Sequence, residues 1–332
     1  MSKPTIMKKL APRKSVAPAA VCAGLCLAGA FDCQAQLTPA QRKQLGTFFG
    51  NRAEVATVLG ATDGASSGRY TVDGRDGNDD LDFSLMKLGG GGEIGSARTL
   101  GDSGATWHPV LMGSIGYLTG ENDISVGALR GNELEESALA LHLGGGAALH
   151  FTERFTVTPT IGVLYGSYDP GFNGRTAIGR TVEATIDDET ADSLGVTPGI
   201  GMAYKLPCGK NTLQFIANYT FYGTTDVGDN DIDQGGSSHV FEQRVDLDIP
   251  LNADLWSCPL HTGGYLGLTE VAGDIGDSMN SDIWATIHAR LLLNTEGKSW
   301  SWKMDRLGLG VSGIAGDNFT GWDAGVEVSF KF

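Results

Sequence analysis

The sequence predicts an all-β protein: a membrane β-barrel of twelve antiparallel strands that follows an N-terminal α-helix. Three observations lead to this prediction. From residue 80 onward, apolar residues recur at every second position over long stretches, which is the period of a strand with one apolar face. Short connections alternate with longer ones that are rich in Gly, Asp and Asn. The first residues form a basic and then apolar segment that is typical of exported proteins.

Residues 1–35 are predicted to be a signal peptide that is cleaved before Gln36. A basic start is followed by the apolar stretch VAPAAVCAGLCLAGAF, and the small residues Cys33 and Ala35 precede the expected cleavage point. A transmembrane anchor is the alternative interpretation, but the stretch is short, rich in Ala and Gly, and interrupted by Pro18.

The chain is acidic, and export would make it more so. It has 24 Lys and Arg against 39 Asp and Glu, a net charge of −15. Loss of residues 1–35 removes five basic residues and one acidic residue, which leaves 19 against 38 and a charge of −19. This charge argues against a nucleic-acid-binding protein. No later stretch of 18 apolar residues exists, so no transmembrane helix is expected.

A helix is predicted at about 39–58, with Thr38 as its N-cap and Pro39 at its first position. Apolar residues fall roughly on one stripe of this helix, although two glycines weaken it. The segment 60–79 is polar and rich in Gly and Asp, and we expect a linker with one short strand at 68–72. The expected organisation is therefore a signal peptide at 1–35, a helix and linker at 36–79, and a barrel at 80–332.

The alternation from residue 80 predicts twelve strands, several of them longer than the five or six residues usual in soluble sheets. The other face of each strand is small and polar. One closed sheet with its apolar face toward lipid and its polar face toward the lumen accounts for this pattern. The expected strands are 81–85, 107–117, 124–128, 139–151, 155–165, 194–204, 213–221, 241–251, 260–271, 283–293, 307–311 and 324–332. Polar-face residues expected to line the lumen are Asp82, His142, His150, Asp246, Asp248 and Glu327.

The connections agree with a membrane barrel, because they alternate between short and long. Short turns are expected at GEN after Thr119 and at 152–154, 207–210, 252–259 and 294–299. Bacterial outer-membrane barrels have short periplasmic turns and longer external loops. With the C-terminus in the periplasm, every short turn falls on the periplasmic side, and the longest external loop is 167–193.

The C-terminal strand carries a resemblance to a known family. Val326, Val328, Phe330 and the final Phe332 share one face, which resembles the signature that outer-membrane assembly machinery reads in bacterial barrels. Twelve strands after a helix resemble the translocator domain of autotransporters over about 39–332. That resemblance implies a helix inside the pore. The chain departs from the pattern because no passenger domain is expected, so it resembles a solitary autotransporter-type barrel.

Residues of the predicted helix are candidates for a plug. Arg42, Lys43, Arg52 and Glu54 could face an acidic, hydrated lumen wall, and a barrel of this size needs filling or holds water. Two alternatives stay open: a periplasmic helix that packs on the barrel mouth or on a partner, and no stable helix at all.

Two cysteines lie in the expected mature chain, Cys208 and Cys258, each in a short turn. The strand count makes these turns neighbours on the periplasmic rim. An exported chain meets an oxidising compartment, so a disulfide between the two is predicted.

The sequence offers no catalytic set and no cofactor site. No serine stands near His142 or His150 with the spacing that a barrel lipase needs, and the other histidines form no pair at metal spacing. Alternating carboxylates at Asp229, Asp231 and Asp233 resemble a calcium loop, but its glycine is misplaced and no Glu closes it. A solvated acidic loop is the plainer interpretation.

Three functions remain as hypotheses. The first is an autotransporter-like barrel with a structural or translocation role and a helix-plugged lumen. The second is a passive diffusion channel for small solutes, cationic ones by preference. The third is a surface-binding barrel that acts through its external loops. The expected partners are outer-membrane lipid, lipopolysaccharide and the assembly machinery, and the sequence does not fix the oligomeric state.

Overall fold

The computed structural model describes residues 39–61, 65–73, 80–101, 104–123, 130–186, 190–228, 235–279, 281–298 and 304–330. The predicted signal peptide lies outside these residues. The helices are α2 (Pro39–Gly60), α3 (Ala177–Ile186) and α4 (Asp274–Met279). The strands are β1 (Ala65–Val72), β2 (Leu81–Glu93), β3 (Arg98–Thr99), β4 (Thr106–Asp123), β5 (Glu133–His150), β6 (Phe155–Asn173), β7 (Ala191–Val196), β8 (Gly199–Cys208), β9 (Asn211–Val227), β10 (Gly236–Leu255), β11 (Cys258–Gly273), β12 (Ile283–Asn294), β13 (Met304–Gly316) and β14 (Phe319–Phe330).

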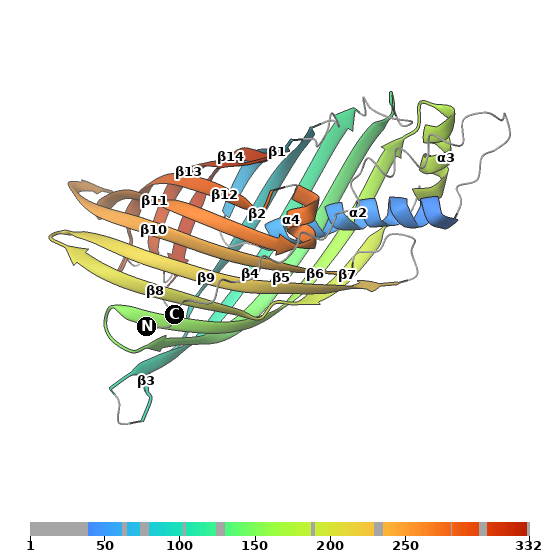
Figure 1. Ribbon diagram of the computed structural model, residues 1–332. Helices are drawn as coiled ribbons and strands as arrows, with labels where there is room; N and C mark the ends of the chain where they lie inside the picture. Colours follow the sequence, from blue (N-terminus) through green and yellow to red (C-terminus); the bar gives the residue numbers. More distant parts are fainter. Residues whose placement is uncertain are drawn as a thin grey trace, which may run out of the picture.

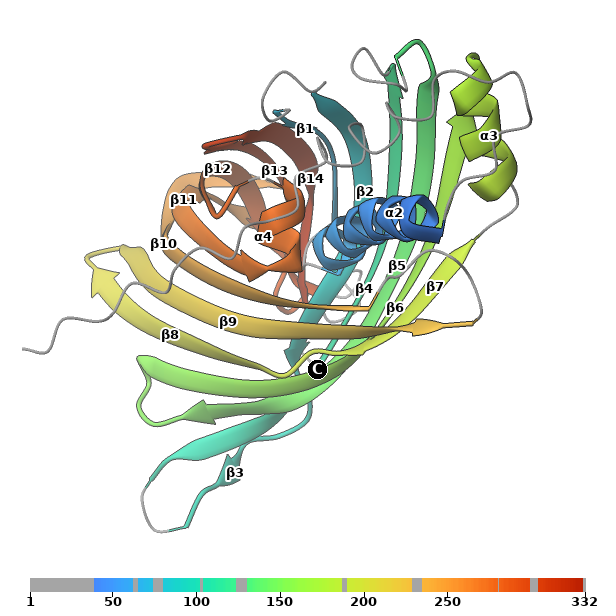
Figure 2. The same ribbon diagram turned by 45° about the vertical axis from the view of Figure 1, so that its right-hand side comes forward.

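The strands form one closed antiparallel barrel, as Figures 1 and 2 show. Neighbours in the chain pair with one another, β14 pairs with β1, and β9 pairs with β10, so the sheet returns to its start. β7 and β8 both lie between β6 and β9, and Pro198 separates them because proline cannot donate to a ladder. Counted as one interrupted strand, they bring the barrel to the predicted twelve. β3 pairs only with the start of β4 and lies off the barrel.

Two assignments behind the predicted count were wrong and compensate for each other. The barrel begins at Ala65 rather than at residue 80, because β1 pairs with β14 and β2 along its whole length. The expected turn at GEN does not exist, since β4 continues through it to Asp123 and pairs there with β5. The strand expected at 124–128 lies outside the described residues.

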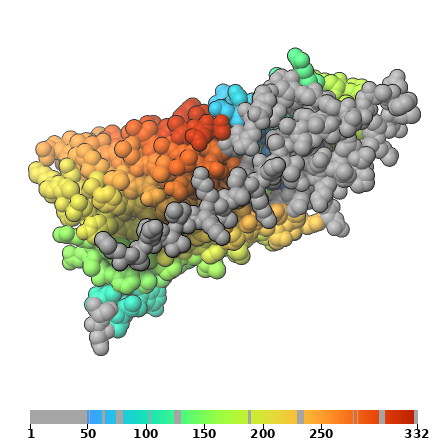
Figure 3. Space-filling model, in the orientation of Figure 1, coloured from blue at the N-terminus to red at the C-terminus, as the bar shows by residue number. Residues whose placement is uncertain are grey.

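The two faces of the wall differ as a membrane barrel requires. Outward-facing residues are large, apolar and exposed: Leu143 is 60% exposed, Ile161 66% and Leu309 66%. Inward-facing neighbours are small or buried, and Ala140 is only 1% exposed. In the space-filling view the yellow to red strands β9 to β14 form a continuous wall (Figure 3). None of the helices in the described part of the chain is long and apolar enough to cross a membrane.

The predicted face of β2 is reversed. Phe83 and Leu85 are 7% and 3% exposed and belong to the core, whereas Met86 and Leu88 are 61% and 65% exposed. Asp82 shares the outward face with Met86, so it does not line the lumen as predicted. It accepts hydrogen bonds from Thr71 at 2.6 Å and Arg69 at 3.0 Å on the outside of the wall.

The barrel has two distinct ends. We call the end that carries α3 and α4 the loop end, and the opposite end, with the turns 151–154, 209–210 and 256–257, the turn end. The turn at 256–257 has Trp256 and Ser257 at φ values of 52° and 61°, as two-residue hairpins require. Part of the loop expected at 167–193 is regular secondary structure. β6 continues to Asn173, because Tyr168 and Phe172 face the core, and α3 follows it.

The predicted helix at 39–58 is confirmed, with α2 ending two residues later at Gly60. α2 packs against β2, β4, β5, β6 and α4, inside the ring of strands in Figure 2. Around it the loop end is filled by an apolar core that includes Tyr70, Phe83 and Phe319, whose rings stack. The closing strand follows the prediction where it is described: Val326 and Val328 face outward, 42% and 36% exposed, whereas Phe332 lies outside the described residues.

Candidate functional site

The first part of the site is the contact between α2 and the inner wall. Phe49, Ala53 and Val58 are each 1% exposed, and Thr57 is 2% exposed. Gly60 approaches the wall so closely that a Cβ there would lie 2.8 Å from the Cβ of Ala140. Residues 53–58 are all buried, so this part of α2 is enclosed on every side like a core helix.

The contacts fix the direction of α2. Its middle, at Arg52, pairs with Glu136, whereas its end at Gly60 contacts Ala140 and Gly116, further along β5 and β4 from the loop end. The hydroxyl of Ser114 then donates to the carbonyl of Ala61 at 2.9 Å. α2 thus enters from the loop end and ends deep inside the barrel.

A buried ion pair links α2 to the wall. The Arg52 side chain is 11% exposed and the Glu136 side chain 4%. The Nε of Arg52 donates to Oε2 of Glu136 at 2.6 Å, a second guanidinium N–H donates to Oε1, and the Tyr168 hydroxyl donates to Oε2 at 2.9 Å. Such a pair is stable in place because each charge has its partner, but either charge alone would be strongly unfavourable.

A second polar link joins α2 to β10 and α4 through Glu54, which is 4% exposed. The hydroxyl of Ser238 donates to Oε1 of Glu54 at 2.7 Å and accepts from the backbone N–H of Ile275 at 3.0 Å. Burial raises the pKa of Glu54 to about 7, the hydrogen bond from Ser238 opposes this rise, and the charge of Asp274 adds to it. Of the four predicted plug residues, Arg52 and Glu54 thus contact the wall. The side chains of Arg42 and Lys43 lie outside the described part.

The inner wall toward the turn end is polar and paired. The predicted lumen residues Asp246, Asp248 and Glu327 lie on it, each beside a cation. Asp246 accepts two bonds from Arg290 at 3.0 and 2.5 Å. Asp248 contacts His261 at 3.0 Å and Arg306 at 2.9 Å, and Glu327 contacts His288 at 2.6 Å and Arg290 at 3.8 Å.

Sequence reasoning missed the cations of this network. Arg290 and Arg306 lie on the inward-facing positions of their strands, and this alternation can be read from the sequence. The inner wall toward the turn end is consequently covered by a network of ion pairs and is not an acidic surface.

The predicted lumen histidines are placed differently from each other. The Nε2 of His142 lies 2.9 Å from the hydroxyl of Thr197, on the inner side of the break between β7 and β8. His150 lies at the turn end, where its Nε2 is 2.9 Å from Oε1 of Glu93. His108 Nδ1 lies 3.6 Å from Oε2 of the same carboxylate. Strand register thus brings His108 and His150, which are far apart in the chain, to the same carboxylate, a juxtaposition that the spacing of histidines in the sequence does not reveal.

The predicted disulfide does not form. Cys208 is exposed at the end of β8, and Cys258 is buried at the start of β11. Three strand spacings separate β8 from β11, about 14 Å in total, whereas disulfide-bonded cysteines need Cα atoms within about 7 Å. The two turns are not neighbours on the rim, because β9 and β10 both lie between the cysteines.

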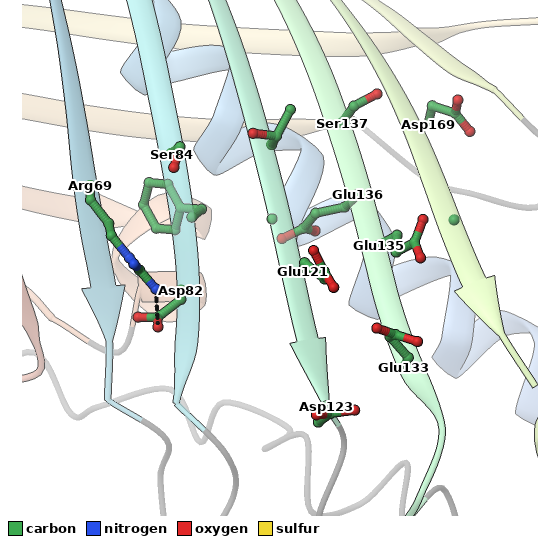
Figure 4. Close-up of a pocket in the computed structure, with 14 residues that line it drawn as sticks. Arg69, Asp82, Ser84, Glu121, Asp123, Glu133, Glu135, Glu136, Ser137 and Asp169 are labelled. Atoms are coloured by element: carbon green, nitrogen blue, oxygen red, sulfur yellow. Dashed lines mark hydrogen bonds and ion pairs between the residues drawn. The ribbon is translucent and has the colours of Figure 1, made fainter. Parts of the chain in front are cut away.

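An open groove of about 620 Å³ lies at the loop end of the wall formed by β1, β2, β4, β5 and β6 (Figure 4). Half of its 14 lining residues are acidic, and Arg69 is the basic residue among them. The carboxylates are Asp82, Glu121, Asp123, Glu133, Glu135, Glu136 and Asp169. The weak metal candidates Asp229, Asp231 and Asp233 lie outside the described residues.

Comparison with solved structures supports the architecture. The transport unit of the autotransporter AIDA-I from Escherichia coli matches with a TM-score of 0.57 and 12% identity, covering 85% of this chain and 97% of that one. The β domain of the Bordetella autotransporter BrkA has a TM-score of 0.47 and 13% identity, covering 80% and 100%. The translocator domain of NalP from Neisseria meningitidis has a TM-score of 0.45 and 12% identity, covering 81% and 87%. At these identities the likeness to AIDA-I shows the fold alone.

Comparison of the sequence with curated proteins found no match. The sequence pattern of one family, the solitary outer membrane autotransporter beta-barrel domain, matches residues 96–324, which is more than half of the chain. Together with the closed barrel and its apolar outer face, this match places the protein in the outer membrane of a Gram-negative bacterium. The chain belongs to the family of solitary outer-membrane autotransporter β-barrel domains.

Proposed function

We propose that this protein is an autotransporter-type barrel whose passage is closed by α2 at rest, with a structural or translocation role. The observation that carries the proposal is the burial of the second half of α2, which contacts β4, β5, β6 and α4 and is buried on all sides over residues 53–58. A helix with its side chains is about 10–12 Å wide. Together with α4 and the inward aromatic residues, it fills the loop end with apolar atoms, through which a hydrated ion does not pass.

The direction of α2 supports translocation over a purely structural role. The helix enters from the loop end, and long loops of outer-membrane barrels face outward. A chain segment ahead of α2 would therefore emerge on the outer side, as a segment carried through the barrel does. The buried pair of Arg52 and Glu136 would then hold the last part of that segment in place.

Single-channel conductance in a planar bilayer tests the proposal. The chain 36–332 is compared with a variant that lacks residues 36–59, and both are checked for folding by far-UV circular dichroism. Arg69→Gln, on the outer face of the wall, is the matched control. A full-length barrel that is closed and a deletion variant that conducts steadily are expected. Equal conductance in both proteins would show that α2 does not close the passage.

The second candidate, a diffusion channel for small solutes, is favoured by the polar inner wall toward the turn end. Asp246, Asp248 and Glu327 on that wall are each paired with an arginine, so a preference for cations would come from the net charge of the whole chain, which is −15. The same recordings decide between the two, because a channel conducts in salt without any deletion. A preference for cations would appear as a reversal potential under a salt gradient.

The outer surface suits the partners that this location implies. We infer that the apolar belt, with Leu88, Ile161 and Leu309 at 65–66% exposure, contacts lipid. We also infer that the assembly machinery reads the C-terminal signal formed by Val326, Val328, Phe330 and Phe332. We infer that the carboxylates of the acidic groove at the loop end (Figure 4) share divalent cations with the phosphates of lipopolysaccharide. The loop end, with α3, is the surface for a binding role, the third hypothesis.

A further inference from the structure

The turn end of the lumen holds a cluster that the proposed function does not use. Glu93 ends β2, His108 begins β4 and His150 ends β5. Strand register brings them together on the inner face, and one ligand atom of each lies within 4.8 Å of the others. The two imidazole rings meet edge to face with their centroids 5.3 Å apart.

We propose that Glu93, His108 and His150 bind a divalent transition-metal ion, with Zn²⁺ as the expected occupant. Two imidazole nitrogens and one carboxylate are a ligand set that zinc accepts, with water in the remaining position. Calcium and magnesium prefer oxygen ligands alone, so the histidines select against them.

The charges around the cluster favour a metal ion over a simple ion pair. Elsewhere on the inner wall each carboxylate beside a histidine also contacts an arginine: Glu327 contacts Arg290, and Asp248 contacts Arg306. Among the described residues, the ion-pair partners of Glu93 are His108 and His150, with no arginine or lysine. The negative charge of Glu93 is therefore not compensated by a permanent cation.

Hydrogen bonding orients His150 as a ligand. Its Nδ1 lies 3.0 Å from the hydroxyl of Thr156. When Nδ1–H donates to that hydroxyl, the lone pair of Nε2 points at Glu93, only 2.9 Å away. A lone pair and a carboxylate oxygen at this distance repel each other unless a cation lies between them. That cation is either a proton, which would make His150 an imidazolium, or a metal ion.

The space and access are suitable. Ligand atoms around tetrahedral zinc lie about 2.0–2.2 Å from the ion, so the three side chains need only small rotations to open their present spacing of 2.9 and 3.6 Å around a metal. The side chains are 41%, 20% and 28% exposed for Glu93, His108 and His150, so an ion can enter from the lumen mouth. A bound ion would tie the ends of β2, β4 and β5 together.

Isothermal titration of the chain 36–332 in detergent with Zn²⁺ alone tests this site. We expect one ion per chain, with affinity at least about tenfold weaker in Glu93→Gln, His108→Ala and His150→Ala, and about tenfold weaker in Thr156→Val. His142→Ala is the matched control, because it removes an inward histidine from the same strand, about 26 Å away. Its affinity should equal that of the unaltered protein.

Two results would overturn the proposal. One is no binding of Zn²⁺ at 100-fold excess over the protein, which would leave a protonated histidine beside Glu93 as the explanation. The other is unchanged binding in all three ligand variants. Should a variant fail to fold, the visible absorption of Co²⁺ bound to the unaltered protein decides, because a spectrum without histidine ligation excludes this site. The conductance experiment does not depend on this outcome.

Discussion

The two halves of the lumen are built on different physical principles. At the loop end, α2, α4 and inward aromatic residues form an apolar core with two isolated polar links, at Arg52 and Glu54. Toward the turn end, the inner wall is a lattice of ion pairs around Arg290 and Arg306. The Arg52–Glu136 pair lies within this apolar core, whereas toward the turn end Arg290 contacts both Asp246 and Glu327, and Asp248 contacts both His261 and Arg306. The difference predicts that similar substitutions act more strongly at the loop end.

The largest effect is expected for Glu136→Gln. This change leaves Arg52 buried without its counter-charge, which costs about 3–5 kcal/mol. α2 should leave the wall, so the closed barrel should show frequent openings in bilayer recordings. Glu135→Gln is the matched control, since the neighbouring residue faces outward and is exposed. Closed recordings from Glu136→Gln would mean that the apolar contacts alone hold α2.

A smaller, pH-dependent effect is expected at Glu54. Its pKa is about 7 when α2 is docked and near 4.5 when it is free, so the docked state binds more protons between these values. Docking is therefore strongest below pH 4.5, weakens as the pH rises to 7, and is constant above that. The full change is on the order of 3 kcal/mol.

Openings recorded from pH 5 to pH 8 measure this dependence. Their frequency should rise with pH in the unaltered protein. Glu54→Gln keeps the hydrogen bond to Ser238 without a charge, so it should remain closed at every pH. A slope that persists in Glu54→Gln would assign the titration to another group.

The smallest effect is expected toward the turn end, for Arg290→Gln. The loss of the charged hydrogen bonds to Asp246 and of the ion pair with Glu327 should lower the free energy of unfolding by about 1–3 kcal/mol. Chemical unfolding followed by tryptophan fluorescence measures it, with Arg69→Gln as the exposed comparison. A loss as large as that in Glu136→Gln would show that both halves of the lumen are equally dry.

The same contrast explains what the sequence could and could not predict. Period-two alternation predicts the wall wherever one face meets lipid and the other a polar lumen. The alternation fails in β2, because both faces of this strand carry apolar residues. Phe83 faces the apolar core around α2, and Met86 faces outward. In β1 the predicted short strand at 68–72 exists, but its small and polar residues hide that it starts at Ala65 and belongs to the barrel. The pattern fails at GEN, where Gly and Asn indicate a turn that β4 does not make.

The sites depend on information that spacing does not contain. Arg52 and Glu54 were predicted because charged residues of a helix in the lumen could face an acidic, hydrated wall, but their partners Glu136 and Ser238 follow only from the packing of α2. The cluster of Glu93, His108 and His150 requires the registers of β2, β4 and β5. The alternation along a strand predicts whether a residue faces the lumen or the lipid. Its position along the barrel axis, and hence its neighbours, follows only from the register between strands.

The seam between β1 and β14 has a consequence for how the barrel assembles. It joins residues 65–72 to residues 319–326, so the two halves of the ladder come from opposite ends of the chain. Loop-closure entropy makes such a distant pairing slow, and the hairpins between neighbouring strands should form first. Closure then depends on a short ladder of eight paired positions, fastened inside by the stacked rings of Tyr70, Phe83 and Phe319 from three adjacent strands. The stacked rings therefore stabilise the closed form of the barrel. Before β1 and β14 pair, the chain is expected to be an open, curved sheet in which these two strands are the unpaired edges.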